Sequence, residues 1–105
     1  MAQFTAYQNV NPATKTAIPY LLNVQNDLIE DLGTRVVVPL YPAAAMQGKT
    51  LKTLTPMVEI EGKSYAMMTP QLAGVPRKSL GAAVADLSSQ RHEIIAALDL
   101  LITGI

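Results

Sequence analysis

The sequence predicts a mainly β domain that carries one C-terminal α-helix. Short runs of β-branched and aromatic residues, separated by Pro, Gly and Asn, fill most of the chain before residue 80. From Ser88 or Ser89 onward, the apolar residues instead recur with a period of 3.6. At 105 residues we expect one domain, residues 1–105, whose core is modest and gains from oligomerisation.

The expected strands follow from alternating and β-branched segments. Three consecutive valines within residues 35–40 predict a strand buried on both faces, and Pro39 should end its pairing or mark a sheet edge. Residues 57–60 and 64–68 flank Gly62 and predict a hairpin. The remaining expectations are strands at residues 3–7, 20–25 and 71–75, a loop over residues 9–19, an acidic turn over 26–33 and a short helical turn at 43–46.

The C-terminal helix has two distinct faces. Serine at its start is expected to cap the first N–H groups, and Gly104 is expected to end it in the left-handed conformation. The apolar face, expected to pack on the sheet, carries Ile94, Ile95, Leu98, Leu101 and Ile102. A second, smaller and more polar stripe carries His92, Ala96, Asp99 and Thr103, and it leads directly to Gly104 and Ile105.

Composition excludes several classes of protein. Eight basic residues balance eight acidic ones, and no basic cluster exceeds the Arg77-Lys78 pair, which argues against direct nucleic-acid binding. The chain lacks cysteine, so it has no disulfide, thiolate metal site or cysteine nucleophile. Neither a signal-like N-terminus nor an apolar run of about 18 residues is present, which predicts a cytoplasmic protein without a membrane span.

Enzymatic sites are poorly supported by the residues. His92 is the only histidine, and its neighbour Glu93 does not face it on a helix, so an exposed structural histidine is favoured over a catalytic one. Asp27, Glu30 and Asp31 lack the periodicity of a calcium loop, which favours a solvated turn. We therefore expect no catalytic residue, no cofactor and no metal. Leu28 and Ile29 in this turn either tuck under the sheet or form part of a recognition surface.

Seven segments, in their order and spacing, carry a resemblance to a known family. They are QFTAY at residues 3–7, VQNDLIE at 24–30, RVVVPL at 35–40, MMT at 67–69, VP at 75–76, VADLS at 84–88 and the C-terminal GI. With these segments the chain resembles the CcdB family of toxins, which poison DNA gyrase and are neutralised by the CcdA antitoxin. The loop at residues 8–19 is longer than in the family's best-known member.

The resemblance implies both a fold and a mechanism. It implies an SH3-like, mostly antiparallel β-barrel or sheet with a small second sheet and a C-terminal helix, as in CcdB and MazF, assembled as a homodimer. It also implies that the paired helix ends enter the dimer interface of the gyrase A subunit while gyrase holds cleaved DNA. Such a toxin is no enzyme, and its partners are gyrase and a CcdA-type antitoxin.

The resemblance also implies a set of gyrase-binding residues. Gly104 and Ile105 match the family, whereas Thr103 replaces a tryptophan that stacks on a gyrase arginine, and Asp99 replaces an asparagine. The complete expected set is Asn26, Leu28, Ile29, His92, Asp99, Ile102, Thr103, Gly104 and Ile105. Two alternatives stay open: a MazF/Kid-type endoribonuclease using residues such as Arg35 and Asp27, and a non-toxic homologue that binds or sequesters antitoxin.

Overall fold

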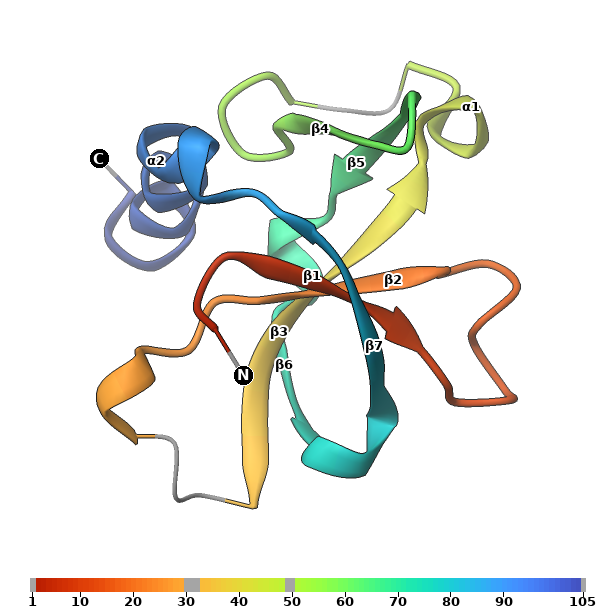
Figure 1. Ribbon diagram of the computed structural model, residues 1–105. Coiled ribbons are helices and arrows are strands. Elements are labelled where there is room, and N and C mark those ends of the chain that lie inside the picture. Colours follow the sequence, from red (N-terminus) through yellow and green to blue (C-terminus); the bar gives the residue numbers. More distant parts are fainter. Residues whose placement is uncertain (1, 30–32, 49–50, 105) are drawn as a thin grey trace.

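The computed structural model describes residues 2–29, 33–48 and 51–104, which form a curled antiparallel sheet with one long helix beside it (Figure 1). Hydrogen bonds join the strands in the order β4-β5-β3-β2-β1-β7, and β6 pairs with β3 beside this path. The predicted mainly β fold class with a C-terminal helix is confirmed. The strands are β1 (Thr5–Asn9), β2 (Tyr20–Asn23), β3 (Thr34–Pro42), β4 (Met57–Ile60), β5 (Lys63–Met67), β6 (Ala73–Pro76) and β7 (Leu80–Asp86).

Helical segments connect and flank these strands. The α-helices are α1 (Ala43–Met46), at the short helical turn expected from the sequence, and α2 (Arg91–Thr103). Single 3-10 turns are η1 (Asp27–Ile29), η2 (Thr69–Gln71), η3 (Arg77–Ser79) and η4 (Ser88–Gln90). Within the described part of the chain, none of the helices combines the length and apolar character needed to cross a membrane.

The long strand β3 is shared by two parts of the sheet. Its first residues pair with β6 and its last residues, from Leu40 to Pro42, pair with β5. The expected small second sheet corresponds to β4, β5 and the end of β3, and β3 makes it continuous with the main sheet. Pro39 does not end the strand, contrary to the sequence prediction. On one side Pro39 pairs with Leu21, and on the other its carbonyl accepts the N–H of Met68. It lies between the part of β3 that pairs with β6 and the part that pairs with β5, so its missing N–H is not needed there.

The central strands are buried on both faces. Adjacent residues of a strand point to opposite faces of the sheet. In each of β1, β2 and β3, one residue enters a larger apolar cluster on one face and its neighbour enters a smaller cluster on the other. Ala6, Leu22 and Val38 join the larger cluster, and Tyr7, Leu21 and Val37 join the smaller one. The prediction of two-sided burial is therefore right for Val37 and Val38 and wrong for Val36, which is 37% exposed.

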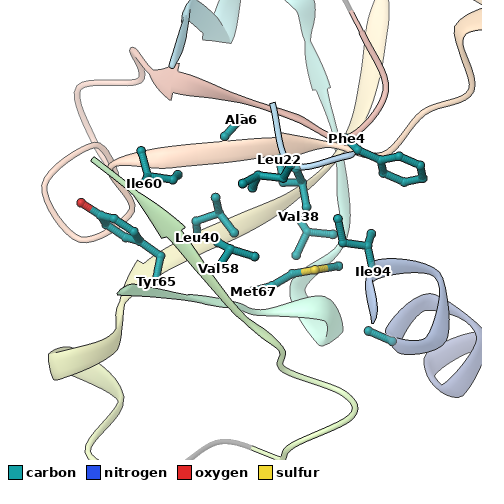
Figure 2. Close-up of a cluster of buried hydrophobic side chains, with 12 residues drawn as sticks. Phe4, Ala6, Leu22, Val38, Leu40, Val58, Ile60, Tyr65, Met67 and Ile94 are labelled. Carbon is teal, nitrogen blue, oxygen red and sulfur yellow. The ribbon is translucent and has the colours of Figure 1, made fainter. Parts of the chain in front are cut away.

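The larger cluster joins the hairpin β4-β5 and α2 to the main sheet (Figure 2). Val58, Ile60 and Met67 of the hairpin meet Leu40 of β3, while Ile94 of α2 lies on the side of Phe4. Glu61 and Gly62 form the two-residue hairpin turn with φ values of 52° and 79°, the pattern of a type I′ turn. The hairpin expected around Gly62 is thus confirmed.

A buried asparagine, Asn9, helps to hold the loop between β1 and β2 in place. The Asn9 amide nitrogen donates to Thr14 Oγ1 at 3.0 Å and to the Ile18 carbonyl at 2.9 Å. Its amide oxygen accepts the backbone N–H of Asn11 at 3.1 Å. The loop consequently packs Ile18 against the smaller apolar cluster.

Strand β7 was not expected from the sequence. Its residues, LGAAVAD, are mostly small and carry little of the β-branched character that marks a strand. Its place depends on close approach to β1, in a ladder with two register shifts. A Cβ on Gly81 would lie 2.7 Å from Val10 Cγ1 and 3.2 Å from Gln8 Cβ, so this position needs glycine for space.

We predict that Gly81→Ala lowers the free energy of unfolding by about 1–2 kcal/mol, because the added methyl overpacks the β1-β7 contact. Gly74→Ala is the matched control, since its Cβ would meet nothing within 4 Å and the glycine is exposed on β6. Chemical denaturation of both variants measures the difference. Equal stabilities would contradict the steric explanation.

Candidate functional site

Helix α2 exposes one stripe and buries the opposite one. Ile94 and Ala97 are fully buried against the sheet, and Ile95 and Leu98 are partly buried beside them. His92, Ala96, Asp99 and Thr103 are all exposed. In Figure 1, α2 lies at the edge of the molecule. The structure therefore brings these residues together on one accessible face of one helix.

One residue of the predicted apolar face is misplaced. Ile102 was expected to pack on the sheet, but it is 71% exposed. At 3.6 residues per turn, Ile102 lies about 80° around the helix from Ile94, at the flank of the buried face. It is also in the last turn, beyond the two fully buried residues. Ile102 thus adds an apolar side chain to the exposed end of α2.

The end of α2 is closed by a glycine cap. Gly104 has φ 76° and its N–H donates to the Leu100 carbonyl at 3.1 Å, as expected for a left-handed C-cap. The Thr103 hydroxyl donates to the Asp99 carbonyl at 2.7 Å. This bond holds the Thr103 hydroxyl against its own helix, so the methyl group is the part of the side chain left for contact with a partner. Ile105, the last residue of the expected set, lies outside the described residues.

The helix starts later than the sequence predicted. Neither Ser88 nor Ser89 caps it; these residues belong to η4, and Gln90 is the N-cap position. Asp86 Oδ1 accepts the Ser88 N–H at 2.9 Å, which directs the chain into η4 first. The hydrogen bonds from Ser88 lower the pKa of the Asp86 carboxyl below its ordinary value. Glu93 lies in the first turn of α2.

A second exposed apolar segment lies at η1. Leu28 is 89% exposed and Ile29 is 50% exposed, so neither tucks under the sheet. Asn26 is exposed, and its side-chain oxygen accepts the Leu28 N–H at 2.8 Å. The Gln25 side chain donates to the Ile29 carbonyl at 2.9 Å. Local bonds thus present both apolar side chains to solvent, which favours the recognition-surface interpretation over the core one.

The two expected parts of the site are separate elements. In the described residues, the backbone of α2 comes close to η2 and η4, and its contact with η1 is at most slight. Residues 26, 28 and 29 therefore form one surface segment, and residues 92, 99 and 102–104 form another. A partner that touches both has to span the face of the molecule between them.

A groove beside α2 was not foreseen from the sequence. It has a volume of about 700 Å³ and lies between the helix and residues 52–57. His92 and Ala96 of the exposed stripe line one wall, and Pro56 and Met57 line the other. No local pattern could have indicated it, because its walls are some 40 residues apart in the chain.

The residues proposed for an RNA-cleaving alternative are poorly placed for that role. The Arg35 side chain is 1% exposed, and its Nη1 donates to the Thr34 carbonyl at 2.8 Å. Asp27 Oδ1 accepts the backbone N–H of Gln3 at 2.7 Å. A buried guanidinium cannot reach a phosphate without rearrangement.

Across the described part of the chain, no three His, Cys, Asp or Glu side chains cluster in a way that could hold a metal ion.

Comparison with known families decides the assignment. The model of the CcdB protein family matches residues 3–104, which is nearly the whole chain. The chain belongs to the CcdB family. It is accordingly assigned as a toxin of a toxin–antitoxin system. The match to CcdB includes both η1 and α2 and therefore covers every described residue of the expected site.

The CcdB-type helix end depends on the glycine at residue 104. We predict that Gly104→Ala destabilises the protein by about 1 kcal/mol, because a Cβ is strained at a φ of 76°. Gly104→Asn is the control, since asparagine tolerates this conformation better and should lose less. Thermal unfolding of the three proteins tests this, and an equal loss for both variants would contradict it.

Proposed function

We propose that this CcdB-family toxin poisons DNA gyrase by binding the gyrase A subunit through the end of α2. The observation that carries the proposal is the exposed end of that helix, in a chain that matches the family over residues 3–104. Ile102 and Thr103 are exposed there, and Gly104 ends the helix. A single exposed apolar side chain is ordinary on a protein surface, so the weight rests on Ile102 lying beside the residues that the family resemblance assigns to gyrase binding.

The proposed mechanism involves binding without catalysis. A ligand shifts a conformational equilibrium only if it binds one state better than the other. The toxin acts by binding the gyrase conformation that holds cleaved DNA more tightly than the resealed one, and religation is thereby blocked. Moving such an equilibrium from 1:99 to 99:1 takes about 5.5 kcal/mol of differential affinity. Helix α2 and the apolar residues of η1 are the surfaces proposed to supply it.

The proposal includes partners and a location. The toxin acts as a cytoplasmic homodimer, so that two α2 ends reach the two-fold interface of gyrase A, and a CcdA-type antitoxin neutralises it. Val36, which is 37% exposed and lies outside both proposed gyrase-binding surfaces, is an apolar side chain that a second copy would cover. Sedimentation equilibrium tests the dimer, and a monomer at micromolar concentration would contradict it.

Removal of residues 103–105 is predicted to abolish toxicity while the fold is kept, because the buried residues Ile94 and Ala97 stay in place. The measurements are growth on induction, gyrase-dependent DNA cleavage in vitro and circular dichroism.

A pair of point variants refines the test. Ile102→Ala should reduce cleavage, whereas Val10→Ala, which shortens an exposed apolar side chain on the β1-β2 loop, should not. Continued cleavage by the truncated, folded protein would refute binding through this end.

The substitution at residue 103 gives a gain-of-function prediction. Thr103→Trp should strengthen gyrase binding about tenfold, because an indole can stack on a cationic group and bury more apolar surface. Ser64→Trp, at an exposed position on β5, is the matched control for nonspecific stickiness. Titration of gyrase A with each variant measures the affinities. A Thr103→Trp protein that binds no better than the parent would count against a contact between residue 103 and a gyrase arginine.

Direct assays distinguish the proposed gyrase poison from two other functions. A MazF-type ribonuclease would cleave RNA, and the buried Arg35 argues against it. A non-toxic antitoxin-binding homologue would bind antitoxin without affecting gyrase. Formation of a gyrase–DNA cleavage complex in the presence of purified protein distinguishes the proposed function from both.

A further inference from the structure

The base of α2 is held by two polar residues that lie outside its buried face. The Gln90 side chain donates to the Met57 carbonyl at 3.0 Å, which ties the helix start to β4. The same nitrogen donates to Glu93 Oε2 at 3.3 Å. The Arg91 guanidinium carbon lies 5.4 Å from the centre of the Phe4 ring, within the range of a cation–π contact. The helix start is thus attached both to β4 and to the turn just before β1.

Phe4 gives Arg91 a fixed platform. Its side chain is 3% exposed, and its backbone has a φ of 64°, which is unusual for a residue other than glycine. Two backbone hydrogen bonds hold it there: its N–H donates to the Asn23 carbonyl at 2.7 Å, and its carbonyl accepts the Leu87 N–H at 2.8 Å. A conformation of this kind persists when the surroundings determine it from several sides.

The far end of α2 has less support from the sheet. The fully buried residues are Ile94, in the first half of the helix, and Ala97 at its midpoint. After them the side chains are partly buried at best, and the last two helical residues, Ile102 and Thr103, are exposed. The rise from Arg91 to Thr103 is about 18 Å, so a rotation of about 10° at the base moves the end by roughly 3 Å. Displacements smaller than this reduce recognition that depends on precise geometry. Contacts at the base therefore control where the exposed end lies.

We propose that Gln90 and Arg91 are positioning residues, which fix the direction of α2 and thereby determine how its exposed end meets a protein partner. The inference rests on the proposed function, in which that partner is the gyrase A subunit. Neither residue belongs to the exposed stripe or to η1. Their polar head groups are held at the surface, so they can be removed without opening the apolar core.

The test compares the unsubstituted protein with three variants. The double variant Gln90→Ala/Arg91→Ala removes both base contacts. Arg91→Lys keeps a cation for the Phe4 ring. Arg77→Ala removes an exposed cation in η3, away from α2, and is the control for charge loss. Three quantities are measured for each: affinity for purified gyrase A fragment by calorimetry, thermal unfolding, and ¹⁵N relaxation with chemical shifts of the amides of residues 100–103.

The double variant should bind gyrase A about tenfold more weakly, since each lost contact contributes a few-fold. Its amides at residues 100–103 should shift or become more mobile, although unfolding stays cooperative. Arg91→Lys should recover much of the affinity, and Arg77→Ala should behave like the parent. Unchanged amides at residues 100–103 would overturn the inference, even if affinity fell. If the parent protein failed to bind gyrase A, the proposed function would fall, whereas the amide measurements would still decide the positioning role.

Discussion

Burial of the central sheet on both faces is the constraint on which the rest of the structure depends. In β1, β2 and β3, one residue of an adjacent pair enters the larger apolar cluster and its neighbour enters the smaller one. A register slip of one residue would exchange every member between the two faces, so the pairing is strongly specified. The larger cluster receives α2 and the β4-β5 hairpin, and the smaller one receives the β1-β2 loop through Ile18. The position of the candidate site thus follows from the register of three strands.

The strands that lie in this two-sided core could be predicted from the sequence, because burial demands β-branched and large apolar residues there. Prediction failed where long-range packing, and not local pattern, decides the structure. Strand β7 is built from small residues and exists because β1 lies close enough to pair with it. Pro39 continues a strand because the neighbouring partner changes from β6 to β5 at that point. In both places the sequence carries a local signal that tertiary contacts override.

The same distinction applies to the candidate site. The exposed stripe of α2 was predictable because helical periodicity alone separates His92, Ala96, Asp99 and Thr103 from the buried face. Ile102 was misassigned because periodicity gives a direction but not the extent of the surface against which the helix packs. The contacts of Gln90 with Met57 and of Arg91 with Phe4 join residues more than 30 and 80 positions apart, so no local pattern could indicate them.

The chemistry at the end of α2 differs from that implied by the family resemblance. With its hydroxyl bonded to the Asp99 carbonyl, Thr103 offers a methyl group and no hydrogen-bond donor. Asp99 places a carboxylate in the C-terminal half of a helix whose last turn carries no basic residue, and the helix dipole does not favour a negative charge there. A charge that is unhelpful to its own helix gains most from a cation on a partner. Under the proposed function, the exposed Ile102 and the Asp99 carboxylate are the groups expected to meet a cationic partner surface, in place of the aromatic ring that the resemblance implies. The differences at residues 99 and 103 that the resemblance implies are therefore expected to change the strength of the proposed partner binding more than its location.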